Sequence, residues 1–149
     1  MIIQTGLRTD IPAFYREWFL NRIKEGYVLV RNPYNENQVT KYSLDPNVVD
    51  LIGFCTKNPA PMLPCMDLLK DYGQYWFVTI TPYGKEIEPG VPAWENVVQD
   101  FRKLSKIVGT DSIGWRYDPI FLSDVYTPER HLRDFESMAT GLSGYTKTC

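Results

Sequence analysis

The sequence predicts an α/β fold with a parallel sheet and flanking helices. Two observations support this prediction. Short apolar runs alternate along the chain with segments that carry helix start and stop signals, as in βα units. Most of the apolar runs are followed by a basic or hydroxylated residue and then by a proline, so the same local pattern recurs along the chain.

Five apolar runs are the predicted parallel strands. They occupy residues 2–3, 27–30, 51–54, 77–80 and 113–115. The aromatic run at residues 75–77 and Trp115 are expected to belong to the core. Residues 38–43 alternate in the manner of a short added strand.

Helix signals fill the segments between these strands. Asp10 is a suitable N-cap, Pro12 suits a first turn and Gly26 suits a helix end, so we expect one helix between residues 10 and 26. Apolar residues at helical spacing predict two further amphipathic helices at residues 92–109 and 127–142. Weaker helical signals lie at residues 46–50 and 65–72.

Length and composition indicate one domain, residues 1–149. Hydrophobic residues make up 44% of the chain, which is enough for a core. The net charge of −2 is unlike that of a general nucleic-acid binder. No apolar run is long enough to cross a membrane and the N-terminus lacks signal-peptide features, so we expect a cytoplasmic protein with no membrane partner. The three cysteines have neither disulfide nor metal-site spacing.

The ends of the predicted strands carry a set of basic and polar residues. In α/β folds the loops after the strands meet at one edge, where ligands bind. The four cations expected there are Arg8, Arg31, Lys57 and Arg116. Together they would favour a phosphate, a nucleotide or a carboxylate as the ligand. The candidate ligand-binding residues are Arg8, Thr9, Asp10, Arg31, Asn32, Lys57, Asn58, Arg116 and Asp118.

Each of these residues also has a structural interpretation. A basic residue beside a strand end is often a solvated loop residue or the partner of an acid such as Asp10 or Asp118. The prolines can simply end strands and begin helices. The convergence of several cations, rather than any one of them, favours a shared site.

No catalytic or metal-binding residue is predicted. His131 stands among charged residues at a helix start, where a solvated position is expected. Cys55 follows a strand beside Lys57, so it is either a small buried hydrophobe or an activated thiol. The chain lacks the GxGxxG, GxxxxGK[ST] and HExxH motifs.

Four phrases of the sequence resemble a bacterial family of domains of unknown function. They are RTDIPAFY at residues 8–15, GYVLVRNP at 26–33, TKNPAPM at 56–62 and WRYDP at 115–119. Members of that family are longer and resemble radical S-adenosylmethionine proteins, with a TIM-type barrel and a cysteine-rich cluster motif near the C-terminus. The resemblance implies that this chain corresponds to their N-terminal half and that the nine strand-end residues belong to the family's site face.

The resemblance does not extend to the cluster motif. No cysteine triplet with the needed spacing is present, so an iron–sulfur cluster and S-adenosylmethionine are expected only if a C-terminal half supplies the cysteines. The chain also departs from the family pattern at three positions beside the expected site. Leu7 stands where the family tends to have Arg, Cys55 where it tends to have Trp, and Pro82 where it tends to have Gly.

Together these points predict a partial (β/α) barrel of the TIM type with about five parallel strands. A complete barrel needs ~250 residues, so we expect a single truncated (β/α) domain with open sheet edges. An exposed edge needs a cover. We therefore expect a homodimer or a hetero-complex.

The predicted function is that of a non-catalytic binding protein. Its partner would be a protein or a nucleic-acid-associated molecule, for example if the chain is a phage or mobile-element inhibitor of a host nucleic-acid enzyme. One alternative is the N-terminal half of a radical S-adenosylmethionine enzyme. Another is a binder of a phosphorylated small molecule through Arg8, Arg31, Lys57 and Arg116. No nucleophile pairs with a base in the sequence, which disfavours catalysis without deciding the matter.

Overall fold

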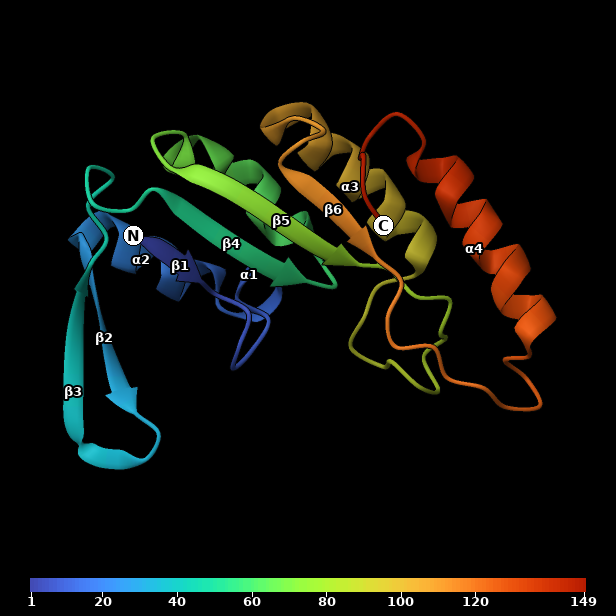
Figure 1. Ribbon diagram of the computed structural model, residues 1–149, viewed down its shortest axis with the longest axis horizontal. Helices are drawn as coiled ribbons and strands as arrows, with labels where there is room; N and C mark the ends of the chain where they lie inside the picture. The colour runs from blue at the N-terminus through green and yellow to red at the C-terminus, as the bar shows by residue number, and fades with distance from the viewer.

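Four strands form one parallel sheet, and two others form a separate hairpin. A computed structural model describes all residues, 1–149. The sheet has the order β1–β4–β5–β6, and all three pairings are parallel. Figure 1 shows the four strands side by side. Their bounds are Ile2–Gln4 for β1, Leu51–Thr56 for β4, Gly73–Thr79 for β5 and Ile113–Arg116 for β6.

The prediction that residues 27–30 form a parallel strand is wrong. They belong to β2 (Tyr27–Asn32), which pairs antiparallel with β3 (Asn35–Ser43). Only two residues separate these strands, whereas a parallel connection needs a crossover of a dozen or more. The added strand predicted at residues 38–43 is confirmed as part of β3. The hairpin extends away from the sheet (Figure 1).

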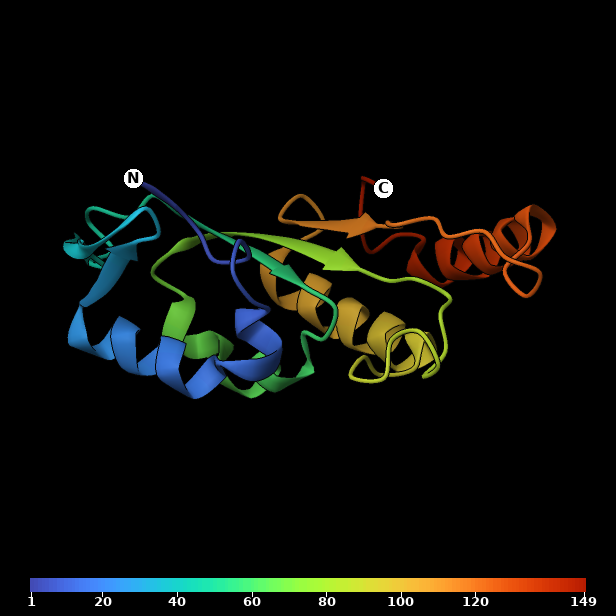
Figure 2. The same cartoon turned by 90° about the horizontal axis from the view of Figure 1, so that it is seen from below.

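The sheet is open, and it does not close into a TIM-type barrel. In Figure 2 the helices that follow β1, β4 and β5 lie below the sheet, and its opposite face carries no helix. Strands β1 and β6 are the edges. The C-terminal segment partly covers the β6 edge, because the Trp115 amide donates to the Thr148 carbonyl at 3.2 Å and the Thr146 hydroxyl donates to the Ile113 carbonyl at 2.8 Å.

The helix predicted between residues 10 and 26 is two helices, α1 (Ile11–Phe14) and α2 (Arg16–Glu25). Its two end signals are confirmed. The Asp10 carboxylate accepts the Ala13 amide at 3.0 Å, and Gly26 ends α2 with φ 75°, a left-handed conformation that glycine adopts readily. The break falls at Tyr15, whose φ of −126° is not helical.

The other helix predictions vary in accuracy. Helices α3 (Trp94–Val108) and α4 (Pro128–Leu142) lie where the spacing predicts them. The weak signal at residues 65–72 falls mostly within a 3₁₀ helix, η1 (Ala60–Leu69), which contains Pro64. Residues 46–50 form only a turn.

The core lies between the sheet and the helices on its covered face. Phe54 and Trp76 are fully buried there, and their rings stack with centroids 4.1 Å apart. Trp115 is also buried, as expected. The prediction that Tyr75 and Phe77 belong to the core is wrong. Alternate side chains of a strand point to opposite faces of the sheet, and these two lie on the uncovered face.

Replacing Phe54 with Ala should lower the free energy of unfolding by ~3–5 kcal/mol, because it opens a cavity beside the Trp76 ring. The exposed Phe14 provides a matched control, and Phe14→Ala should change stability by less than ~0.5 kcal/mol. Urea unfolding measures both values. Equal losses in the two variants would contradict the assignment of the core.

Candidate functional site

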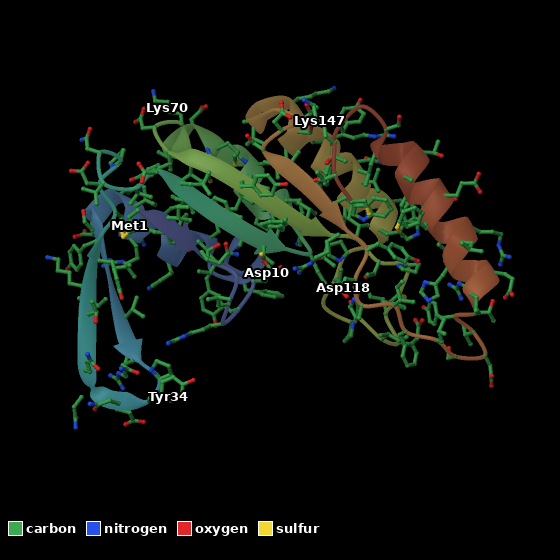
Figure 3. The ribbon with its side chains drawn as sticks, viewed as in Figure 1. Met1, Asp10, Tyr34, Lys70, Asp118 and Lys147 are labelled. Carbon is green, nitrogen blue, oxygen red and sulfur yellow. The ribbon has the colours of Figure 1, made fainter.

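The sequence predicts that the strand-end residues form one basic face, but the structure places most of them in three separate groups. Arg8 and Arg31 line a first cavity. Asp10 and Lys57 are held in hydrogen-bond networks between loops. Arg116 lines a second cavity beside α4. Figure 3 shows Asp10 and Asp118 near the same edge of the sheet, and Tyr34 far from it at the tip of the hairpin.

The first cavity lies between the β2–β3 hairpin, α2 and the loop after β1. Its volume is about 550 Å³, within the ~300–1,000 Å³ range of small-molecule sites. Most of its lining is apolar and includes Trp18, Phe19, Val28, Val30 and Leu44. The polar part of the wall consists of Arg8, Arg22, Arg31, Gln4, Thr5 and Thr9. No acidic residue lines it, so the cavity combines an apolar surface with positive charge.

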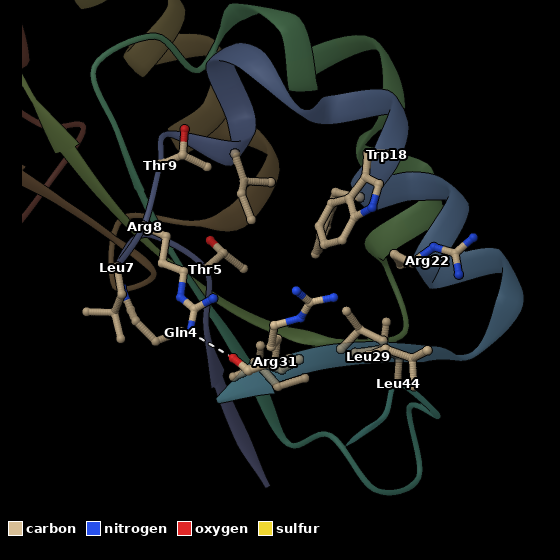
Figure 4. Close-up of a pocket in the computed structure, with 15 residues that line it drawn as sticks. Gln4, Thr5, Leu7, Arg8, Thr9, Trp18, Arg22, Leu29, Arg31 and Leu44 are labelled. Carbon is tan, nitrogen blue, oxygen red and sulfur yellow. Dashed lines mark hydrogen bonds between the residues drawn. The ribbon is translucent and has the colours of Figure 1, made fainter. Parts of the chain in front are cut away.

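Arg8 and Arg31 reach this cavity from different elements. Arg8 comes from the loop after β1, Arg31 comes from β2, and Figure 4 shows both side chains directed into the cavity. The Arg8 guanidinium donates to the backbone carbonyl of Arg31 at 3.2 Å, so the two residues are neighbours. Neither residue forms a salt bridge. Both guanidinium groups therefore border the cavity without a counter-ion from the protein.

Thr9 and Asn32, the sequence neighbours of these arginines, have different positions. Thr9 also lines the first cavity. The Asn32 side chain instead stabilises the hairpin turn, since its amide nitrogen donates to the Gln38 side chain at 2.7 Å and its oxygen accepts the Tyr34 amide at 2.9 Å. Asn32 does not line this cavity, and the hydrogen bonds of its side chain lie within the hairpin.

Asp10 joins two loops. In addition to capping α1, its carboxylate accepts the Thr56 hydroxyl at 3.0 Å and the Lys57 amide at 2.8 Å. Asn58 lies in the same turn, where its amide donates to the Thr56 hydroxyl at 2.9 Å and its side-chain oxygen accepts the Ala60 amide at 3.3 Å. Asp10 therefore holds the end of β4 against α1, and Asn58 stabilises the turn that follows β4.

The Lys57 charge is neutralised within the protein. Its ammonium group forms a salt bridge with Glu88 and donates to the Thr81 hydroxyl at 3.3 Å. Thr81 in turn donates to Glu88 at 2.9 Å. Sequence reasoning missed Glu88, and the only signal for it is an acid in the loop that follows β5. The paired Lys57 adds no net positive charge to a ligand site.

Arg116 and Asp118 follow β6 and differ in their contacts. The Arg116 Nε donates to the Thr79 hydroxyl at 3.1 Å, and Arg116 forms no salt bridge. It lines the second cavity, of about 590 Å³, together with side chains of α4. Asp118 is exposed and lines neither of the two cavities.

His131 is buried, and the prediction of a solvated position is wrong. Its Nε2 lies 2.9 Å from the Phe121 carbonyl, which can only accept, so Nδ1 accepts the Tyr117 hydroxyl at 2.7 Å. Burial, together with the charge of nearby Asp134, raises the pKa of Tyr117 to about 12. The prediction of a solvated position rests on the charged neighbours of His131 in the sequence, and these lie on other faces of α4.

The cysteines do not gather into a cluster site. Cys55 lies on the uncovered sheet face, where its Sγ accepts the Gln4 side-chain amide at 3.0 Å. Cys65 lies in η1 and Cys149 near β6, and all three are free thiols. No three His, Cys, Asp or Glu side chains come close enough together to hold a metal ion. The residues of this chain therefore do not fit an iron–sulfur cluster.

A family model described as "Domain of unknown function (DUF1848)" matches residues 2–149. The chain belongs to the DUF1848 family. The match includes the sheet, the hairpin and both cavities. Comparisons with curated proteins and with solved structures found no match. No helix of this DUF1848 domain has the length and apolar character that a membrane span requires.

Asp10→Ala should lower the free energy of unfolding by ~1–3 kcal/mol, because it removes a helix cap and leaves the Thr56 and Lys57 donors without their acceptor. Asp118→Ala is the matched control, and we expect almost no change. Thermal and urea unfolding measure both. If Asp10→Ala were as stable as the parent protein, its proposed structural role would be refuted.

Proposed function

We propose that the protein is a non-catalytic binding protein for a small anionic molecule, held in the first cavity between Arg8 and Arg31. One observation carries this proposal. Two guanidinium groups from separate elements point into the same cavity, and no carboxylate neutralises them. Guanidinium groups bind phosphate and carboxylate oxygens through paired, charge-assisted hydrogen bonds. An anion would supply the missing counter-charge.

The remaining wall indicates what the anion is attached to. The Trp18 ring and the Val28 and Leu44 side chains offer an apolar surface beside the arginines. A ligand with an aromatic or other apolar body can displace water from this surface while its anionic end contacts Arg8 and Arg31. These features support a phosphate monoester with an apolar body as the ligand class.

The composition of the cavity supports binding rather than catalysis. Its wall contains no Asp, Glu, His, Cys or Lys side chain. General acid–base and nucleophilic catalysis need a proton acceptor within hydrogen-bond reach of the reacting atoms. The hydroxyls of Thr5 and Thr9 have no such base among the lining residues.

Phenyl phosphate is a suitable probe, because it pairs a dianion with one aromatic ring. Arg31→Gln should weaken its binding by about 10–100-fold, the loss expected for charge-assisted hydrogen bonds. Arg133→Gln, on α4 and outside the cavity, removes the same charge and should leave affinity unchanged. Isothermal titration calorimetry measures the affinities, and quenching of tryptophan fluorescence provides a second readout.

Two results would overturn this proposal. One is the absence of phenyl phosphate binding by the parent protein, and the other is an equal loss in the Arg31→Gln and Arg133→Gln variants. The second result would indicate a general charge effect rather than a site.

The uncovered sheet face favours a second candidate function, binding of a protein partner. Ile2 is 70% exposed and Phe77 is 39% exposed. The strand register puts both on the same face of the sheet, which is the face without a helix. Exposed apolar side chains on a sheet face that no helix covers are candidates for burial against a partner. We propose a second copy of the chain as the partner that covers this face.

If a homodimer covers this face, sedimentation equilibrium should give twice the monomer mass of 17.3 kDa. Phe77→Asp should convert the dimer to a monomer, because it would bury a charge in the interface. Phe14→Asp places the same charge at an exposed phenylalanine among the helices and should preserve the dimer. A monomeric parent protein would contradict the dimer proposal.

The relationship to a radical S-adenosylmethionine barrel is also a proposal. Parallel strands with helices on one face are the arrangement expected for part of a (β/α) barrel. Such an enzyme would need the cluster cysteines from another polypeptide segment, because those of this chain are dispersed. The residues of this chain therefore support no catalytic step through such a group.

A further inference from the structure

The second cavity has a different character from the first. It lies between the loop after β6 and helix α4, and its volume is about 590 Å³. Four large apolar side chains border it and are strongly exposed, although apolar groups in water are unfavourable. They are Ile120 and Leu122 from the loop and Leu132 and Phe135 from α4.

The polar groups in this wall are mostly occupied. His131 and Tyr117 bond to each other, and the second ring nitrogen of His131 donates to the Phe121 carbonyl. No Asp or Glu lines the cavity. The remaining polar side chains of the wall are the free thiol of Cys149 and one cation.

That cation is Arg116, whose guanidinium is both anchored and available. Its Nε donates to the buried Thr79 hydroxyl at 3.1 Å, while its two terminal nitrogens have no protein acceptor. The single bond orients the guanidinium and leaves its paired donors free for an anion. One free cation beside a largely apolar wall matches a monoanion on an apolar chain.

We propose that this second cavity binds a carboxylate that carries an apolar chain, such as a medium-chain fatty acid. The carboxylate contacts the terminal nitrogens of Arg116, and the chain lies against Leu122, Leu132 and Phe135. This site is separate from the Arg8–Arg31 cavity, since the two share no lining residue. Its occupation does not depend on the function proposed for the first cavity.

Octanoate and 1-octanol, which have the same chain length, test this proposal by calorimetry on the full chain. The parent protein should bind octanoate more tightly than octanol. Arg116→Gln should weaken octanoate at least about tenfold, as expected for loss of a charge-assisted hydrogen bond, and should leave octanol unchanged. Leu132→Asn, at a side chain that is 71% exposed, should weaken both ligands without unfolding the protein. Arg133→Gln is the charge-matched control.

Cys149 provides an independent readout, because it lines the second cavity. Octanoate should slow its alkylation by iodoacetamide in the parent protein but not in Arg116→Gln. Cys65, which lines neither cavity, is the internal reference in the same mass spectrum. The proposal is overturned if octanoate does not bind, if Arg116→Gln binds it as tightly as the parent, or if Cys149 reacts at the same rate with and without it.

Discussion

The Asp10 carboxylate is the interaction on which the geometry of the strand-end edge depends. It caps α1 and accepts donors from the turn after β4, so it links two loops that are 46 residues apart in sequence. Arg8 precedes it by two residues. Asp10 therefore anchors the chain just after Arg8, whose guanidinium is held in the first cavity by the Arg31 carbonyl. In the structure the Asp10 carboxylate is engaged by three donors of the protein itself.

Charge along this edge is distributed by the order of the strands. The loops after the central strands β4 and β5 contribute Lys57 and Glu88, which neutralise each other. The edge strands β1 and β6 lead to Arg8 and Arg116, and neither has an acidic partner. The unpaired Arg8 and Arg116 therefore lie at the two sides of the sheet, and each borders its own cavity. Because Glu88 neutralises Lys57 between them, Arg8 and Arg116 border two separate sites rather than one basic face.

Local signals predicted much of the fold, because they are set by nearby residues. The Asp10 cap, the Gly26 stop and the bounds of α4 all follow from chemistry within a few positions of the chain. The pairing of β2 does not, since an apolar run reads alike in a parallel sheet and in a hairpin. The feature that argues against a parallel strand is the two-residue connection to β3, which is too short for a crossover. The prediction of a solvated His131 is wrong for a related reason, because its charged neighbours in sequence do not share its face of the helix.

The sequence predicts that Arg8 and Arg31 lie together, although it places β2 in the wrong sheet. Placing residues 27–30 in the parallel sheet put Arg31 at a strand end beside Arg8, and in the structure the hairpin brings Arg31 there by another route. The hairpin contributes a wall that a sheet strand could not, since its side chains face α2 across an open space. A parallel strand would have buried Val28 and Val30 in a sheet layer. The separate hairpin instead leaves them to line a cavity, so the departure from the predicted topology creates the space that a ligand needs.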